Sequence, residues 1–199
     1  MLENLVLLWL SALVLMGSPG PATVSLAAMG TAYGFRRSGS YLIGVMAGTT
    51  GVLLLIATGI TAIILAEPVF VRVLSFVAAA YIFYLAWRIA TAPIGAGPKA
   101  SEKAPAFWPG LMVSLPNPKA FAAIGAAFAG HSIVPDSLLS DTVAKVAAIA
   151  TVVVIVNVGW LAFGTVFSRV LTHPTHGRIV NILFACLLVV SVGIALWNL

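Results

Sequence analysis

Long runs without a charged residue constrain the fold of this chain more than any other sequence feature. The first run extends from about Asn4 to about Tyr33 and contains no Asp, Glu, Lys or Arg. A helix needs about 20 apolar residues to cross the hydrocarbon core of a bilayer. Charged residues make up only 8% of the 199 positions, against about 25% in soluble domains. Because the runs lack the alternating pattern of barrel strands, the sequence predicts an all-α membrane protein.

The apolar segments number six, and a linker separates them into two halves. The linker, residues 92–106, is rich in Pro, Gly and charge. It divides the chain into a first transmembrane repeat, residues 1–91, and a second, residues 107–199. The expected transmembrane helices cover approximately residues 4–33, 39–66 and 69–89 in the first repeat and 107–130, 143–167 and 179–197 in the second.

The basic residues predict the orientation of these spans, because Lys and Arg are retained on the cytoplasmic side. Grouping alternate loops places two sets of basic residues on opposite sides. The larger set is Arg36, Arg37, Arg88, Lys99, Lys103, Arg169 and Arg178, and the smaller set is Arg72 and Lys145. We therefore expect both termini on the outer side. Three spans per half also make the second half enter the membrane in the opposite sense, which is an inverted repeat.

The first span of each repeat contains a Pro-x-Pro motif, Pro19-Gly20-Pro21 in one and Pro116-Asn117-Pro118 in the other. Proline removes a backbone donor and breaks a helix. A break inside the bilayer exposes carbonyl and amide groups that need a partner, such as water or a polar solute in a cavity. Broken helices at matching places of inverted halves indicate a transporter's substrate site. The alternative is that both motifs are simple kinks.

Lys119 follows the second motif directly and is the charge that we place deepest in the membrane. It lies eleven residues after Trp108, or ~17 Å at the helical rise, and an unpaired lysine at that depth is costly unless it has a function. The half-helices that we expect to restart at Ala22-Thr23 and Lys119-Ala120 would direct positive dipole ends to the same cavity. A carboxylate suits this site, so a small amino acid fits better than a metal cation.

The predicted substrate-binding residues are the two breaks and the polar residues inside neighbouring spans. They are Pro19, Gly20, Pro21, Thr23, Thr49, Asn117, Pro118, Lys119 and Asn157. For Thr49 and Asn157, hydrogen bonding between helices is an equal alternative. Lys119 is also the candidate for proton coupling, because a desolvated lysine can release its proton near neutral pH.

Several other classes of function lack the residues that they need. A single cysteine, Cys186, excludes an intramolecular disulfide, and His173 and His176 have no neighbouring acid that would complete a metal site. No catalytic set of side chains is present, so we expect neither an enzyme nor a cofactor. The net charge of +5 is scattered over segment ends, which argues against nucleic-acid binding.

Five stretches resemble the LysE/RhtB family of amino-acid exporters over essentially the whole chain. They are Ser18-Pro19-Gly20-Pro21, residues 33–39, Gly44-x-x-x-Gly48, residues 80–87 and Asn117-Pro118-Lys119-Ala120. The glycine pair by itself favours close helix packing. The resemblance implies a multi-pass carrier of the bacterial inner membrane, driven by the proton motive force and assembled as a homodimer. It exports an amino acid or a derivative.

One position departs from the family pattern, because many relatives have an aspartate where Thr49 stands. This argues against a cationic substrate and against a proton carrier at that position. The alternative functions are a non-transporting membrane scaffold or a passive channel. Metal efflux is a weaker alternative, because His, Cys, Asp and Glu are scarce inside the spans.

Overall fold

The computed structural model describes residues 2–59, 69, 76, 79–80, 82–84, 86–87, 90–91, 106–170 and 174–197. In this part of the chain the regular elements are α-helices, which confirms the all-α class for these residues. The helices are α1 (Leu2–Gly17), α2 (Pro21–Arg37), α3 (Gly39–Ala57), α6 (Phe107–Ser114), α7 (Pro118–Ala129), α8 (Leu138–Val170) and α9 (Pro174–Trp197).

Two described helices are long and apolar enough to cross a membrane, α3 and the Leu138–Val166 part of α8. A third span is formed if α1 and α2, which bend by 66° at their junction, count as one broken helix. Length and composition therefore support a membrane protein. The full set of six spans stays a prediction. Most of the predicted span 69–89, residues 92–105 of the linker and the side chains of His173 and His176 lie outside the described residues.

Both predicted helix breaks are present. The predicted first span is interrupted between the end of α1 at Gly17 and the start of α2 at Pro21. The predicted fourth span is interrupted between the end of α6 at Ser114 and the start of α7 at Pro118. Each restarting helix begins at the second proline of its motif, one residue earlier than the sequence predicts. The physical reason is that the first position of a helix needs no amide hydrogen and favours the φ angle of proline. Asn117 caps the second restart, since its Oδ1 accepts the Lys119 amide at 3.1 Å.

Other helix ends differ from the predicted segments. The predicted segment 39–66 is too long for one helix, because α3 ends at Ala57 and Gly59 follows with a φ of 74°. Such a positive φ is left-handed backbone, which glycine adopts readily and which ends a helix. In α2 the helical φ/ψ values are interrupted at Gly34, close to the predicted end at Tyr33. Helices α8 and α9 begin before their apolar segments, because polar first turns do not prevent helix formation.

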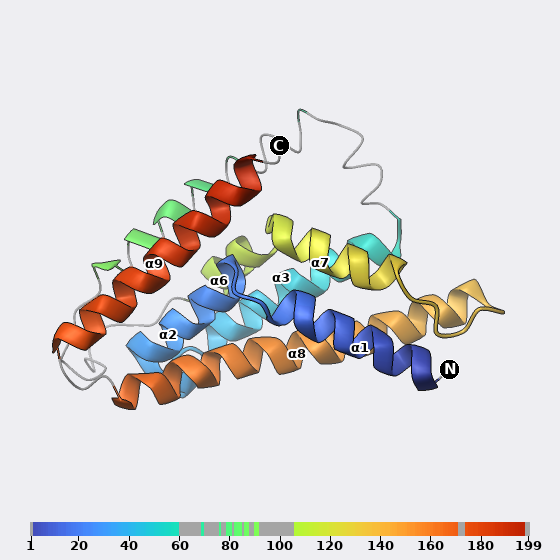
Figure 1. Ribbon diagram of the computed structural model, residues 1–199, viewed down its shortest axis with the longest axis horizontal. Helices are drawn as coiled ribbons and strands as arrows, with labels where there is room; N and C mark the ends of the chain where they lie inside the picture. The colour runs from blue at the N-terminus through green and yellow to red at the C-terminus, as the bar shows by residue number, and fades with distance from the viewer. Residues whose placement is uncertain are drawn as a thin grey trace.

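The long helix α8 lies beside α1, α2 and α3, while α3 also contacts α6 and α7 (Figure 1). Glycines allow two of these pairs to approach backbone to backbone. A Cβ on Gly44 would lie 2.0 Å from the carbonyl oxygen of Phe107, across the α3–α6 contact. A Cβ on Gly164 would lie 1.9 Å from the carbonyl oxygen of Ala27, across the α2–α8 contact. The interpretation of Gly44-x-x-x-Gly48 as a packing motif is therefore confirmed.

Buried apolar side chains form two clusters at different levels along the bundle. One cluster joins α2, α3, α8 and α9 around Leu26, Leu161 and Leu188. The other joins α1, α3, α7 and α8 around residues such as Leu8 and Ile124. Met46 and Trp160 pack against both clusters. The middle of the bundle, where the two helix breaks occur, is therefore flanked by apolar packing on both sides.

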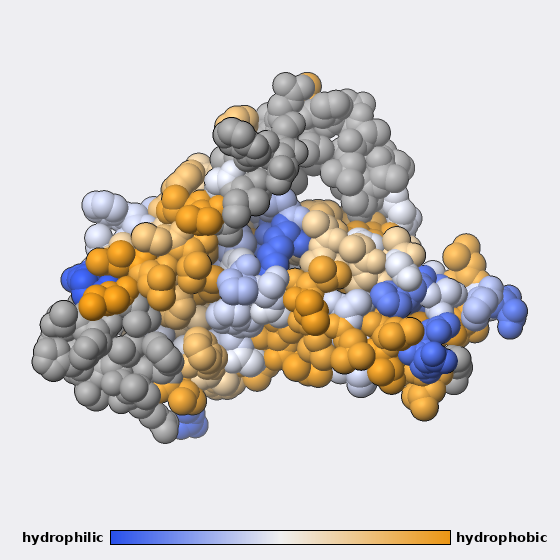
Figure 2. All heavy atoms as spheres, viewed as in Figure 1, coloured by the Kyte–Doolittle hydropathy of each residue, from blue (hydrophilic) through white to orange (hydrophobic). Residues whose placement is uncertain are grey.

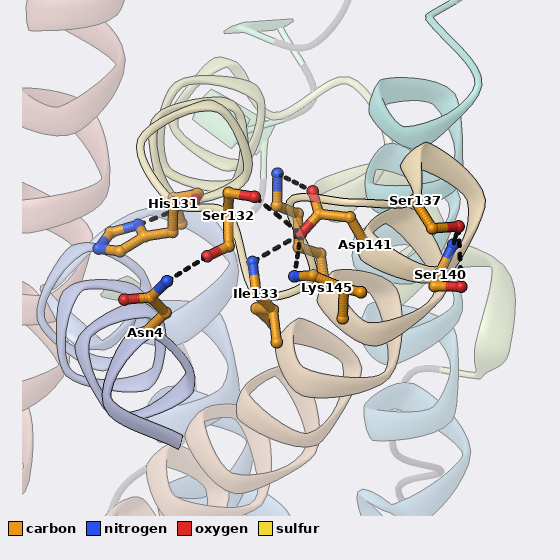
Figure 3. A network of polar contacts seen from close by, with 10 residues as sticks. Asn4, His131, Ser132, Ile133, Ser137, Ser140, Asp141 and Lys145 are labelled. Carbon is orange, nitrogen blue, oxygen red and sulfur yellow. Dashed lines mark hydrogen bonds and ion pairs between the residues drawn. The ribbon is translucent and has the colours of Figure 1, made fainter. Parts of the chain in front are cut away.

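A buried ion pair holds the loop between α7 and α8 (Figure 3). The Asp141 carboxylate lies 2.7 Å from Nζ of Lys145 and accepts the backbone amide of Ile133 at 2.6 Å and the following amide at 2.9 Å. The side-chain amide of Asn4, in α1, donates to the Ser132 carbonyl at 2.6 Å. This loop is thereby tied to the starts of both α1 and α8.

The surface agrees with a lipid environment. Figure 2 shows apolar side chains over most of the described surface on the face formed by α1 and α8, with hydrophilic residues toward the two ends of the long axis. Large apolar side chains such as Val14, Ile155 and Val166 are more than half exposed. A patch of hydrophilic residues also interrupts the apolar surface near the middle, over the region of the helix breaks.

Candidate functional site

The two helix breaks lie side by side, as the pairing of the proline motifs predicts. The broken helices α1–α2 and α6–α7 run in opposite directions along the bundle (Figure 1). Lys119, in the first turn of α7, reaches across to the other break. Its ammonium group donates to the carbonyl oxygen of Ser18 and lies 3.5 Å from that of Met16. Its alkyl chain occupies the space beside Gly20, where a Cβ would lie 2.5 Å from Cδ of the lysine.

A small cavity opens at this junction. Six of the nine residues predicted from the sequence line it: Gly20, Thr23, Thr49, Asn117, Lys119 and Asn157. The volume open to the centres of water molecules is about 30 Å³, which is room for about two waters, since each needs about 10–15 Å³ measured in that way. In this conformation the cavity therefore admits the polar end of a small ligand.

The three predicted prolines do not line the cavity. Pro19 is exposed, whereas Pro21 and Pro118 are the first residues of α2 and α7. Their effect is on the backbone, because they place the interruptions and begin the helices whose first turns face the cavity. The sequence did not single out Met16, Ala22, Ala120, Ala123 and Val156, which complete the lining.

The polar residues Thr49 and Asn157 line the cavity, and each donates a hydrogen bond within its own helix. The hydroxyl of Thr49 donates to the Val45 carbonyl of its own helix at 2.9 Å. The side-chain amide of Asn157 donates to the Val153 carbonyl of its own helix at 2.8 Å. The Thr49 hydroxyl keeps its oxygen lone pairs for a ligand, and the Asn157 side chain keeps its carbonyl oxygen and its second N–H.

Lys119 is the one residue with a formal charge among the described residues that line the cavity. The first turns of α2 and α7 add the partial positive charge of helix N-termini. Together these groups make the site suitable for an anionic group such as a carboxylate. The lysine is half-buried, so its electrostatic interactions are weakened less by solvent than those of a surface lysine.

The free carbonyl groups at the end of α1 have partners from other helices, which differs from the sequence-based expectation of water or solute. The ammonium group of Lys119 donates to the carbonyl oxygens of Met16 and Ser18. The indole N–H of Trp160, in α8, donates to the Gly17 carbonyl at 3.1 Å. Sequence reasoning did not identify Trp160. Its position inside an apolar segment, where tryptophan is less common than near the interfaces, was the available signal.

No group of three or more His, Cys, Asp or Glu side chains that could hold a metal ion occurs within the ranges that the structure describes. The ion pair of Asp141 and Lys145 belongs to the α7–α8 loop and does not line the cavity. The described lining of the cavity offers a ligand hydrogen-bonding groups and one positive charge.

Known proteins resemble this chain over most of its length. Residues 13–198 match the model of the LysE type translocator family. The chain is 32% identical over 182 residues to the cysteine/O-acetylserine efflux protein of Salmonella typhi, and 31% identical over 181 residues to that of Escherichia coli strain K12. Each of these alignments covers 91% of both chains. No solved structure gives a significant match.

Proposed function

The chain belongs to the LysE type translocator family and is an amino-acid exporter, and from this premise we propose that its substrate is a small amino acid or derivative without net charge. The family consists of translocators, so the protein is a transporter and not an enzyme. The observation that carries the substrate proposal is the position of Lys119, which brings one positive charge to the junction of two broken helices.

The substrate carboxylate binds beside Lys119 in this proposal. A hydrogen bond to a charged group contributes about 1.5–3 kcal/mol, roughly twice a neutral one. The first turns of α2 and α7 add favourable electrostatics through the residues that line the cavity there, Thr23 and Asn117 among them. Without the lysine, the free-energy cost of removing this carboxylate from water would exceed the stabilisation that neutral hydrogen-bond donors provide.

The size and charge of the cavity favour a short substrate. The lining provides neutral acceptors at Thr49 and Asn157 but no Asp or Glu among its described residues, so a second positive charge on the substrate would have no counterion. The small volume agrees with this restriction. The names of the two relatives cited above refer to cysteine and O-acetylserine, which are short and carry no net charge at neutral pH.

The proposed setting is the bacterial inner membrane, crossed by six spans in two inverted repeats, with both termini in the periplasm. The opposite directions of the two broken helices support the inverted repeat. The basic residues Arg36 and Arg37 lie at the end of α2, at the other end of the bundle from the chain's N-terminus, which supports the orientation. A homodimer follows from the family resemblance alone.

Transport proceeds in this proposal by alternating access, powered by the proton motive force, with Lys119 as the coupling group. The two apolar clusters, one on each side of the cavity, are the barriers that would open in turn. The position of the cavity between the two clusters supports this scheme, because apolar packing lies on either side of it.

Efflux from proteoliposomes tests the proposal. Vesicles that contain the purified protein are loaded with O-acetyl-L-serine, and its release is followed with and without an imposed proton gradient. We expect the gradient to drive movement against the concentration difference, and Lys119→Ala to abolish it. The matched control is Thr151→Ala, an exposed polar residue of α8 that does not line the cavity.

Two outcomes contradict the proposal. Transport by correctly folded Lys119→Ala at the wild-type rate would mean that the substrate site lies elsewhere. Release that only equilibrates the two compartments, whatever the gradient, would identify a passive channel.

A further inference from the structure

We propose that the main-chain carbonyl oxygens of Met16 and Ser18 form the subsite for the ammonium group of the substrate, and that Lys119 occupies this subsite while no substrate is bound. The inference rests on the proposed function and extends it, because it assigns the second charged group of a zwitterionic amino acid to a part of the chain that the family comparison does not identify.

The end of α1 has the chemistry of a cation site. The last carbonyl groups of a helix have no partner within the helix and carry the negative end of its dipole. Here the helix ends at Gly17, beside the cavity, where Met16 is buried and Ser18 is exposed. The carbonyl oxygen of Met16 therefore depends most on a partner supplied by the protein or by a ligand. The Thr23 hydroxyl lies 3.4 Å from the Ser18 oxygen and satisfies it only weakly.

A primary ammonium group already occupies this place. The Lys119 Nζ donates to Ser18 and lies 3.5 Å from the Met16 oxygen. The α-ammonium of an amino acid is the same chemical group, with three donors and one positive charge. The structure therefore shows that these carbonyls accept an ammonium, and that the cavity next to them has room for a small polar group.

The alternatives for the ammonium are weaker. Among the described lining residues there is no carboxylate, and Thr49 and Asn157 offer single neutral oxygens. The Gly17 carbonyl, which lies between the two proposed ligands, is bonded to the indole of Trp160 at 3.1 Å. Trp160 is thus a positioning residue, because it holds the end of α1 while leaving the oxygens of Met16 and Ser18 for an ammonium.

Binding is then an exchange of partners. The substrate ammonium donates hydrogen bonds to the two carbonyl oxygens in place of Lys119. The displaced Lys119 then pairs with the substrate carboxylate, which is bonded to the same carbon as the ammonium. An amine without a carboxylate would bring a second positive charge and leave Lys119 without a partner. An acid without an ammonium would draw Lys119 away and leave the carbonyls unsatisfied. The exchange consequently selects substrates that carry both groups.

The first experiment compares two isomers on the wild-type protein in detergent. O-acetyl-L-serine has a free ammonium and a carboxylate, whereas N-acetyl-L-serine has the same atoms with the ammonium converted to an amide. We expect the N-acetyl isomer to bind at least about tenfold more weakly by calorimetry, as for the loss of hydrogen bonds made by a charged group. O-acetyl-L-serine methyl ester, which lacks the carboxylate, should be weakened similarly. Equal affinities of the two isomers would overturn the subsite.

The second experiment needs no substrate. Lys119→Ala removes three carbons and the ammonium, and n-propylammonium carries the same groups. We expect this cation to raise the melting temperature of purified Lys119→Ala but not that of the wild type, whereas 1-propanol at equal concentration has no such effect. Absence of this rescue in folded Lys119→Ala would overturn the proposal. If the variant does not fold, the isomer comparison on the wild type still decides.

The two experiments separate this inference from the proposed function. If neither isomer binds the wild type, the proposed substrate class is wrong, while rescue by n-propylammonium would still support the ammonium subsite. If O-acetyl-L-serine binds and is exported but the isomers do not differ, the substrate proposal holds and the subsite is refuted.

Discussion

A Cβ atom on Gly20 would lie 2.5 Å from Cδ and 3.2 Å from Nζ of Lys119, so these two residues, one from each helix break, occupy adjoining space. The backbone of Gly20 has φ −171° and ψ 178°, an extended conformation that any residue adopts. The lysine side chain therefore fills the space that a side chain at this position would need, and it would have to shift to make room for one. The absence of a side chain at Gly20 leaves room for the lysine to reach the end of α1. The first helix break therefore accommodates the side chain of Lys119, which follows the second break.

Gly20→Ala should therefore lower export by displacing the lysine. The added methyl group requires the Lys119 side chain to shift, and we expect this shift to weaken its contact with the Ser18 and Met16 carbonyls. Efflux of O-acetyl-L-serine from proteoliposomes should then fall by up to about tenfold, as for the loss of a charge-assisted hydrogen bond. Gly17→Ala is the matched control, because a Cβ there has nothing within 4 Å. Equal rates for the two variants would show that the position of Lys119 does not matter for transport.

Thr49→Asp should impair export through charge rather than shape. A carboxylate at this place in the cavity would pair with Lys119 and compete with the carboxylate of the substrate. Thr49→Asn has a similar size and no charge, so we expect the aspartate variant to export at least several-fold more slowly than the asparagine variant. The measurement is the initial efflux rate at matched protein content. If both variants slow transport equally, the electrostatic interpretation of the cavity is wrong.

The buried pair of Asp141 and Lys145 predicts unequal effects of removing either partner. Asp141→Ala leaves the Lys145 ammonium and two backbone amides without an acceptor, and we expect a cost of about 3–5 kcal/mol and a clearly lower melting temperature. Lys145→Met leaves the carboxylate bonded to those amides, so its melting temperature should fall less.

The control for this pair is Asp136→Asn, because Asp136 is exposed in the same loop. It should melt close to the wild type. A larger loss of stability in Lys145→Met than in Asp141→Ala would contradict the assigned hydrogen bonds.

Glycine packing predicts a contrast between two positions of α8. A Cβ on Gly164 would lie 1.9 Å from the Ala27 carbonyl oxygen, so Gly164→Ala must separate α2 from α8 and should destabilise the protein by about 1–3 kcal/mol. Gly159→Ala places its methyl group where nothing lies within 4 Å, and alanine favours helix more than glycine does. Thermal unfolding in detergent measures both. Similar melting temperatures would mean that the close helix contact contributes little.

The sequence was a good guide to the elements and a weaker guide to their ends. Proline identified both breaks, since its lack of an amide hydrogen acts locally and does not depend on the rest of the fold. The end of α3 at Ala57 was missed, because the residues after it remain apolar and hydrophobicity does not record the backbone turn at Gly59. Likewise, Trp160 was not identified, since its partner is a main-chain carbonyl of a helix 143 positions away in the chain.

The amino-acid sequence by itself determined that this is a helical membrane protein with two broken helices and one lysine beside them, because composition and proline chemistry act over short distances along the chain. Only the tertiary structure decided what that lysine touches. Its ammonium could have faced water or a substrate, but the space beside Gly20 lets it reach carbonyl groups at the end of α1 that have no partner within that helix. An unsatisfied helix end inside the bundle is costly, and which side chain satisfies it depends on the neighbour that folding places there.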